Sequence, residues 1–275
     1  MSASPHRDVE DYREKLLWRR PVPPPLAGLV ERFTGYREDG TAFTGDVEMA
    51  SLVVPIIIKF GKPFRIGLGR RPASTDSFGS FIAGLYPGPV VIDSSGWSEC
   101  VQIDLTPLGA ARFFGVPMTE LANRMISLED FGDGELSLLR RRLADERGWD
   151  RRLALVERFT MERMARGRSP DAAVSWAYQS MLAAGGNVRV GGIAKRLDWS
   201  RKHFSHRFQA VIGLSPKSVA RIVRFQSVLA MASGDEPIRW ADIAAACGYA
   251  DQAHLSREFS EFAGTTPAAW MAGAA

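Results

Sequence analysis

The sequence predicts an α+β chain whose N-terminal half is rich in β-strands and whose C-terminal half is entirely helical. Three observations lead to this fold class. Short β-prone runs, separated by turn residues, fill the segment from about residue 26 to 105. After Thr106-Pro107 the apolar residues recur at intervals of three and four, which is typical of helices. Finally, two similar segments at an offset of about 50 residues occupy the C-terminal part.

The β-prone runs are short and rich in branched or aromatic residues. They cover residues 51–60, 64–68, 80–85, 90–92 and 100–105. Turn sequences such as Gly61-Lys62-Pro63 and Pro87-Gly88-Pro89 lie between them. This spacing predicts an antiparallel sandwich or barrel over residues 21–106, and we expect residues 1–20 to be a polar N-terminal tail.

A helical connector is predicted over residues 107–168, where Leu136, Leu139 and Leu143 mark one helical face. Residues 108–124 have some features of a helix-turn-helix. Because they directly follow β-prone sequence, we interpret them as a helix pair leading into the connector. Ser169-Pro170-Asp171 contains an N-cap candidate followed by proline, so a new domain is predicted over residues 169–275.

The internal repeat is the most informative feature. Ile193-Ala194 match Ile243-Ala244 at an offset of 50. The later matches, at an offset of 51, pair His203, Ser205, Phe208, Gly213 and Pro216 with His254, Ser256, Phe259, Gly264 and Pro267. The change of offset shows that the two turns differ in length by one residue. Each copy, about 187–216 and 239–267, is predicted to be a helix-turn-helix, and a helix over about 217–232 joins them.

The second helix of each copy has an apolar and a polar face. Phe204, Phe208 and Val211 face the core in the first copy, and Leu255, Phe259 and Phe262 do so in the second. The opposite faces offer small or hydrogen-bonding side chains, as a helix in the DNA major groove requires. The candidate DNA-binding residues are Arg201, Lys202, Ser205, His206, Gln209, Gln252, Ala253, Ser256 and Arg257. The alternative is an ordinary solvated face, which two copies in matching register disfavour.

Charge is divided unevenly along the repeat, although the whole chain carries only +4. Residues 187–232 contain nine basic side chains and one acidic one, a net charge of +8, whereas residues 233–275 contain two basic and six acidic ones, a net charge of −4. Phosphate neutralisation contributes much of DNA affinity, so we expect the first unit to anchor the complex. Arg257 is the one outward cation on the second helix. We expect it to contact guanine, the alternative being an ion pair with Glu258, Glu261 or Asp251.

These residues resemble the DNA-binding domain of AraC/XylS-type bacterial transcription regulators. Residues 193–216, 221–230 and 243–267 carry the resemblance, with Trp199 as a departure where a glycine turn is more usual. The resemblance implies a sequence-specific DNA-binding regulator, and it places Lys202, Ser205, His206, Gln252, Ala253, Ser256 and Arg257 in base-facing positions. The N-terminal half is similar to the β-rich, cupin-like domains of such regulators, which implies that it senses a ligand or mediates dimerisation. The implied partners are double-stranded DNA, a small-molecule effector, a second copy of the chain and, for an activator, RNA polymerase.

Several other functions find little support. The four histidines, His6, His203, His206 and His254, all lie outside residues 26–105, so a metal-binding cupin is not expected. His203 and His206 have a spacing that could bind a metal, but on a recognition helix a packing or DNA role is favoured, so no metal site is predicted. No cofactor motif or catalytic residue is predicted either. Two other classes stay open: a cupin-like enzyme with an appended DNA-binding module, and a protein-interaction module. The aromatic residues Phe60, Phe64, Phe78, Phe81, Tyr86 and Trp97 form either an effector pocket or simply core, so the effector-binding residues are unknown.

The longest apolar stretch and the first residues of the chain indicate where in the cell the protein is expected. The longest apolar stretch, residues 52–58, is too short to cross a membrane, so no membrane partner is expected. The charged residues 6–11 are unlike a secretory signal, and we expect a cytoplasmic protein. Cys100 and Cys247 are far apart in sequence and are expected to be buried thiols.

Overall fold

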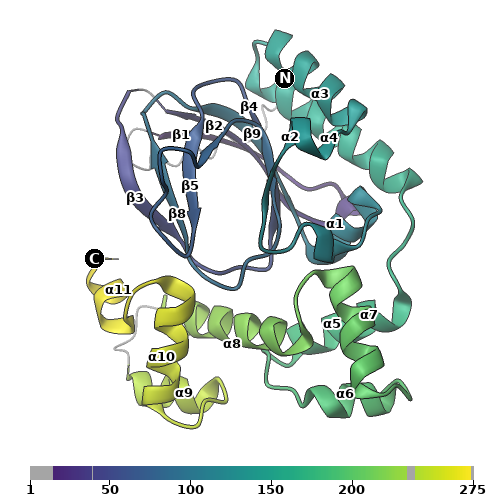
Figure 1. Ribbon diagram of the computed structural model, residues 1–275, viewed down its shortest axis with the longest axis vertical. Helices are drawn as coiled ribbons and strands as arrows, with labels where there is room; N and C mark the ends of the chain where they lie inside the picture. The colour runs from purple at the N-terminus through teal and green to yellow at the C-terminus, as the bar shows by residue number, and fades with distance from the viewer. Residues whose placement is uncertain (1–14, 39, 234–238, 274–275) are drawn as a thin grey trace, which may run out of the picture.

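The computed structural model describes residues 15–38, 40–233 and 239–273 (Figure 1). A β-rich part comes first, and an all-α part follows it, built around the long helix α8 (Pro216–Ala232). Figure 1 shows the two antiparallel sheets of the β-rich part facing each other above α8. This arrangement confirms the predicted α+β fold class.

The larger sheet has six strands and the smaller one has four, in the orders β1-β2-β9-β4-β7-β10 and β3-β8-β5-β6. The first sheet consists of β1 (Lys15–Arg20), β2 (Val30–Glu38), β9 (Glu99–Leu105), β4 (Val54–Lys59), β7 (Phe81–Ala83) and β10 (Met125–Ser127). The second consists of β3 (Phe43–Glu48), β8 (Val90–Ser94), β5 (Phe64–Leu68) and β6 (Ser77–Phe78). Strands therefore form at all five predicted runs, and the others add to the same sheets.

Strand alternation divides the apolar side chains between two cores. On β4, Ile57 belongs to a small cluster together with Phe64 and Ile66 of the other sheet. Its neighbours Ile56 and Ile58 point the opposite way and join the large core, which continues through the helices. The larger sheet is thus covered on both faces.

Strand β1 corrects the expected N-terminal tail, since Lys15–Arg20 pair with β2 at the edge of the larger sheet. The physical reason is an aromatic contact: the ring of Trp18 stacks on Trp149 with a centroid distance of 4.3 Å. Gly35 of β2 makes room for Trp149, because a Cβ at this glycine would lie 2.5 Å from the indole ring. Residues 1–14 of the predicted tail lie outside the described residues.

The connector contains four helices, which are α1 (Pro107–Phe114), α2 (Leu128–Phe131), α3 (Gly134–Asp145) and α4 (Trp149–Arg166). Helix α4 packs on β1, β2 and β9. In place of the helix pair expected over residues 108–124, α1 is followed by a single 3-10 turn, η2 (Met118–Glu120). Gly115 ends α1 in the left-handed region at φ 68°, and Pro117 disfavours a helical conformation at the residue before it.

The all-α part contains seven helices within the described residues. Besides α8 they are α5 (Ala172–Ala183), α6 (Val190–Arg196), α7 (Arg201–Ile212), α9 (Trp240–Ala246), α10 (Gln252–Ala263) and α11 (Pro267–Gly273). The cap of α5 is Asp171, whose carboxylate accepts hydrogen bonds from the N–H groups of Ala173 and Val174 at 2.9 and 3.2 Å. The cap therefore lies two residues beyond the predicted Ser169.

The two parts of the chain meet at both ends of α8. At one end α7 packs against α1 and η2, and a Cβ at Gly213 would lie 3.2 Å from the carbonyl oxygen of Met118. At the other end the N–H of Ala50 donates a 2.9 Å hydrogen bond to the carbonyl oxygen of Phe262. The C-terminal ends of α7 and α10 are thus both held by the β-rich part.

Candidate nucleic-acid interface

Helices α6 and α7 form the first helix-turn-helix unit. Asp198 lies in the turn at φ 53°, a left-handed conformation that Asp tolerates better than most residues. Ser200 then caps α7, and its hydroxyl accepts a 3.1 Å hydrogen bond from the N–H of His203. Because Asp198 takes the left-handed position, Trp199 does not substitute for the usual turn glycine.

Helices α9 and α10 repeat this construction. Gly248 occupies the position of Asp198, at φ 75°. Ala250 is the additional residue of this longer turn, and Asp251 caps α10 by accepting a 2.6 Å hydrogen bond from the N–H of His254. The change of offset from 50 to 51 residues therefore comes from the second turn.

An aromatic residue and a histidine join turn to helix in both units. Trp199 meets His203 edge-on with ring centroids 4.8 Å apart, and Tyr249 meets His254 in the same way at 5.2 Å. His203 and His254 are equivalent in the repeat, so these contacts correspond. The predicted apolar faces are also confirmed, except that Val211 is only half-buried and Ile212 takes the buried position next to it.

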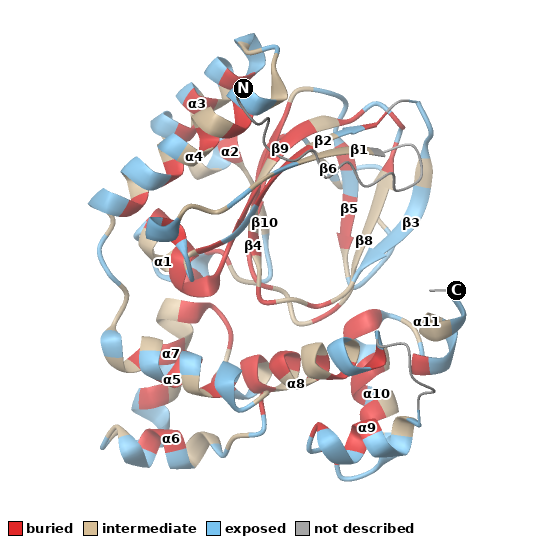
Figure 2. Cartoon of the chain, turned by 180° about the vertical axis from the view of Figure 1, so that it is seen from behind, coloured by how far each residue is buried: buried red, intermediate tan, exposed pale blue. Residues whose placement is uncertain are grey.

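None of the nine candidate DNA-binding residues is buried. Figure 2 shows that both α7 and α10 carry unburied as well as buried residues. Arg201, Lys202, His206, Gln252, Ala253 and Arg257 are exposed, and Ser205, Gln209 and Ser256 are partly exposed. They form one set on α7 and one on α10, at opposite ends of α8 (Figure 1). Their base-facing role stays a prediction.

A cluster of ion pairs connects α8 with α10. Glu258, whose side chain is 3% exposed, accepts hydrogen bonds from Arg221 at 2.7 Å, Arg224 at 3.2 Å and the Tyr249 hydroxyl at 2.9 Å. Arg221 also pairs with Glu261. We call these five side chains the inter-unit clamp.

The clamp sets the ionisation of its members. Burial alone would raise the pKa of Glu258, but the hydrogen bonds from Arg221 and Tyr249 and the charges of both arginines hold this pKa below its ordinary value. The hydrogen bond to Glu261 and the charge of Glu258 raise the pKa of Arg221 further, despite its partial burial. Both partners therefore stay charged at neutral pH.

The clamp also changes the distribution of free charge. Arg221 and Arg224 belong to the nine cations of the first unit, yet they neutralise carboxylates of the second. Arg207, a third member, pairs with Asp171. Sequence reasoning missed the clamp, although a signal existed: Arg221 and Arg224 are three residues apart, as are Glu258 and Glu261, so each pair lies on one helix face.

The β-rich part contains a second buried polar cluster. Glu38 accepts hydrogen bonds from the Tyr36 hydroxyl, the Ser94 hydroxyl and the Ser98 N–H at 2.6, 2.6 and 2.9 Å. The Lys59 ammonium donates to the Ser98 hydroxyl at 2.9 Å and lies over the ring of Phe64. Burial lowers the pKa of Lys59 to about 8.

The aromatic residues considered for an effector pocket do not form one group. Phe64, Phe78 and Phe81 pack in the cluster between the sheets, while Trp97 is 58% exposed. In the described residues no three His, Cys, Asp or Glu side chains are grouped as metal ligands. Likewise, none of the described helices is long and apolar enough for a bilayer.

Residues 193–273 match the family model described as "Helix-turn-helix domain". No curated protein matches the chain. Similar solved structures include the C-terminal domain of AraT, a response regulator from Geobacillus stearothermophilus, with 20% identity over 38% of this chain and 87% of that one and a TM-score of 0.35. The DNA-binding domain of AdpA in complex with a target DNA shares 24% identity over 37% and 87%, with a TM-score of 0.32. ToxT from Vibrio cholerae shares 11% identity over 94% and 98%, with a TM-score of 0.44. The resemblance predicted from the repeat is confirmed: the C-terminal part of this chain is a helix-turn-helix domain of the AraC/XylS type.

Proposed function

We propose that this protein is a sequence-specific DNA-binding transcription regulator of the AraC type, and not an enzyme. One observation carries the proposal: two helix-turn-helix units of the same construction lie at the two ends of α8, each with an unburied polar helix face. Such faces fit the major groove, where small and hydrogen-bonding side chains can reach base edges. Helix α8 then sets the spacing between the two DNA-recognition helices, α7 and α10.

In this function α7 and α10 enter successive major-groove segments about 34 Å apart, which is roughly one turn of DNA. Arg201, Lys202, Ser205, His206 and Gln209 contact the first segment. The second segment is contacted by Gln252, Ala253, Ser256 and Arg257. A single chain then reads two half-sites on one face of the duplex.

Selection of bound duplexes from a random DNA pool tests this proposal with the full chain. The expected result is one enriched sequence with two conserved blocks. Hydroxyl-radical footprinting on it should protect two patches about 10 base pairs apart. If no sequence is enriched, the protein is not a sequence-specific regulator, and a single short protected patch contradicts reading by both units.

For the β-rich part we propose a regulatory role, as a ligand sensor or as a dimerisation domain. The contacts of Gly213 and Phe262 with this part support it, because they link the β-rich part to both units. Sedimentation of the full chain distinguishes the two roles. A dimer that persists without DNA supports dimerisation, and a monomer whose melting temperature rises with a small molecule supports sensing. If the chain is an activator, RNA polymerase is its further partner.

A further inference from the structure

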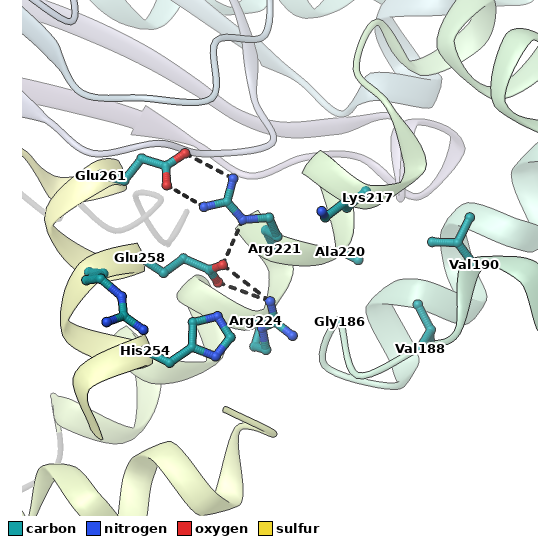
Figure 3. Close-up of a pocket in the computed structure, with 11 residues that line it drawn as sticks. Gly186, Val188, Val190, Lys217, Ala220, Arg221, Arg224, His254, Glu258 and Glu261 are labelled. Atoms are coloured by element: carbon teal, nitrogen blue, oxygen red, sulfur yellow. Dashed lines mark hydrogen bonds and ion pairs between the residues drawn. The ribbon is translucent and has the colours of Figure 1, made fainter. Parts of the chain in front are cut away.

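A groove of about 540 Å³ separates the two helix-turn-helix units (Figure 3). One wall is the N-terminal half of α8, and the other is the face of α10 that carries His254 and Glu258. Gly186 and Val188, from the loop after α5, and Val190, at the start of α6, complete it on the side of the first unit. Both units therefore contribute to this groove.

The groove carries an excess of positive charge that the clamp leaves available. Lys217, Arg221, Arg224 and Arg257 line it together with only two carboxylates, those of Glu258 and Glu261. The clamp pairs both carboxylates with Arg221 and Arg224. No ion pair of Lys217 or Arg257 is found in the part of the chain that the structure describes. The uncompensated charge thus belongs to Lys217 on one wall and Arg257 on the other.

The groove is continuous with the surface proposed to read DNA, because Arg257 belongs to both. A duplex that contacts α7 and α10 at the same time must pass over the surface between the two units. The DNA between the half-sites presents phosphates there, and unpaired carboxylates would repel them. The clamp removes this repulsion by neutralising Glu258 and Glu261.

We propose that the groove holds the phosphate backbone of the DNA between the two half-sites, with Lys217 as a phosphate ligand. This inference rests on the proposed function. Lys217 is exposed at the first turn of α8, on the side of the first unit (Figure 3). Its flexible ammonium is a point charge suited to a backbone phosphate and carries no base preference. Lys217 therefore contributes affinity, and not sequence selectivity.

The test uses the full chain and a DNA sequence selected from the random pool. Two versions of this duplex are compared: one is unmodified, and the other has neutral methylphosphonates at the phosphates between the protected patches. On the unmodified duplex Lys217→Ala should lower affinity about tenfold and should flatten the slope of log affinity against log salt by about one. On the neutral duplex the same substitution should have no effect.

Lys62→Ala, which removes an exposed lysine of the β-rich part, is the matched control and should leave both duplexes unaffected. The inference is overturned if Lys217→Ala weakens both duplexes equally, or weakens neither while the wild-type protein binds. Failure of the wild-type protein to bind any DNA would instead overturn the proposed function, and this inference with it.

Discussion

Glu258 of α10 and Arg221 of α8 form an ion pair, 2.7 Å from Nε to Oε2, in which the carboxylate is buried and the guanidinium is partly exposed. The pair lies between the second helix-turn-helix unit and the helix that connects it to the first. Arg221 also lies over the ring of Phe262, 4.8 Å from its centroid. Ionic and aromatic contacts thus act on the same guanidinium. The orientation of the second reading helix relative to α8 therefore depends on a few charged side chains as well as on the apolar core.

Glu258→Gln should destabilise the fold by about 3 kcal/mol at neutral pH, because it leaves two arginines without their buried counter-ion. The folded pKa of Glu258 is below the ordinary 4.5, so its stabilisation is complete above that pH and is lost as the pH falls through the folded pKa. The difference between wild type and variant should then shrink in acid, as urea unfolding at pH 7 and pH 4 would show. Asp242→Asn is the control: it breaks the exposed pair with Arg239 and removes a carboxylate from the first turn of α9, and it should cost less than about 1 kcal/mol. A difference that does not depend on pH contradicts the assigned role.

Two adjacent glycines differ sharply in how much space surrounds them. Both Gly185 and Gly186 have positive φ, but a Cβ at Gly186 would lie 2.2 Å from the carbonyl oxygen of Ala220 in α8. Gly185→Ala should cost about 1 kcal/mol, mostly from backbone strain, because its Cβ would meet the side-chain hydroxyl of Ser227 at 3.3 Å and no backbone atom. Gly186→Ala should cost about 3 kcal/mol or more, because the loop must also move away from α8. Thermal unfolding of the two variants checks this, and equal losses would show that the loop yields freely.

Because Lys59 is buried, the stability of the folded protein should depend on pH in the alkaline range. Burial lowers its pKa from 10.5 to about 8, so between these values the unfolded chain binds the proton more tightly and stability rises with pH. This contribution amounts to about 3 kcal/mol over the interval. Lys59→Met should remove it and should stabilise the protein at pH 7. Chemical denaturation of both proteins at pH 7 and pH 10 measures the effect, and parallel pH profiles would contradict it.

Salt dependence tests the anchoring role of the first unit. Replacing Arg201 and Lys202 by alanine should flatten the slope of log affinity against log salt by up to about two, since each lost phosphate contact removes one released counterion. The matched control replaces Arg141 and Arg142, two adjacent exposed arginines of α3, by alanine, and it should leave the slope unchanged. An unchanged slope in the first variant would place the phosphate contacts elsewhere.

The sequence predicted the repeat and its apolar faces well because these depend on local periodicity. Phe204, Phe208, Leu255 and Phe259 are buried as their spacing indicates. Strands β2 and β3 were not predicted, and the reason is visible in their composition. Gly35 interrupts the β-prone sequence of β2, and its missing side chain leaves room for Trp149. Strand β3 is mostly exposed, so its sequence lacks an alternation of apolar and polar residues.

Contacts between distant segments account for the other features that sequence reasoning missed. Arg221 and Glu258 are 37 residues apart, and only the packing of α10 on α8 brings them together. Strand β1 similarly depends on Trp18 meeting Trp149. The expectation that the first unit anchors the complex counted its net charge of +8 as if each side chain were independent. Three of its arginines, however, have carboxylate partners outside the unit.

Arg257 offers the sharpest test of base recognition. The three carboxylates considered as alternative ion-pair partners of Arg257 all have other hydrogen-bond partners in the structure. Glu258 and Glu261 belong to the inter-unit clamp, and Asp251 caps α10. Arg257→Ala should therefore relax selectivity at one base position by about 1 to 3 kcal/mol and leave the fold intact. Arg257→Lys is the decisive companion, since lysine keeps the charge but lacks the bidentate guanidinium that matches guanine. Binding to a panel of single-base variants of the selected sequence should show the same relaxed position for both substitutions. If lysine restores wild-type affinity and selectivity, or if alanine weakens every sequence equally, Arg257 contacts phosphate and not guanine.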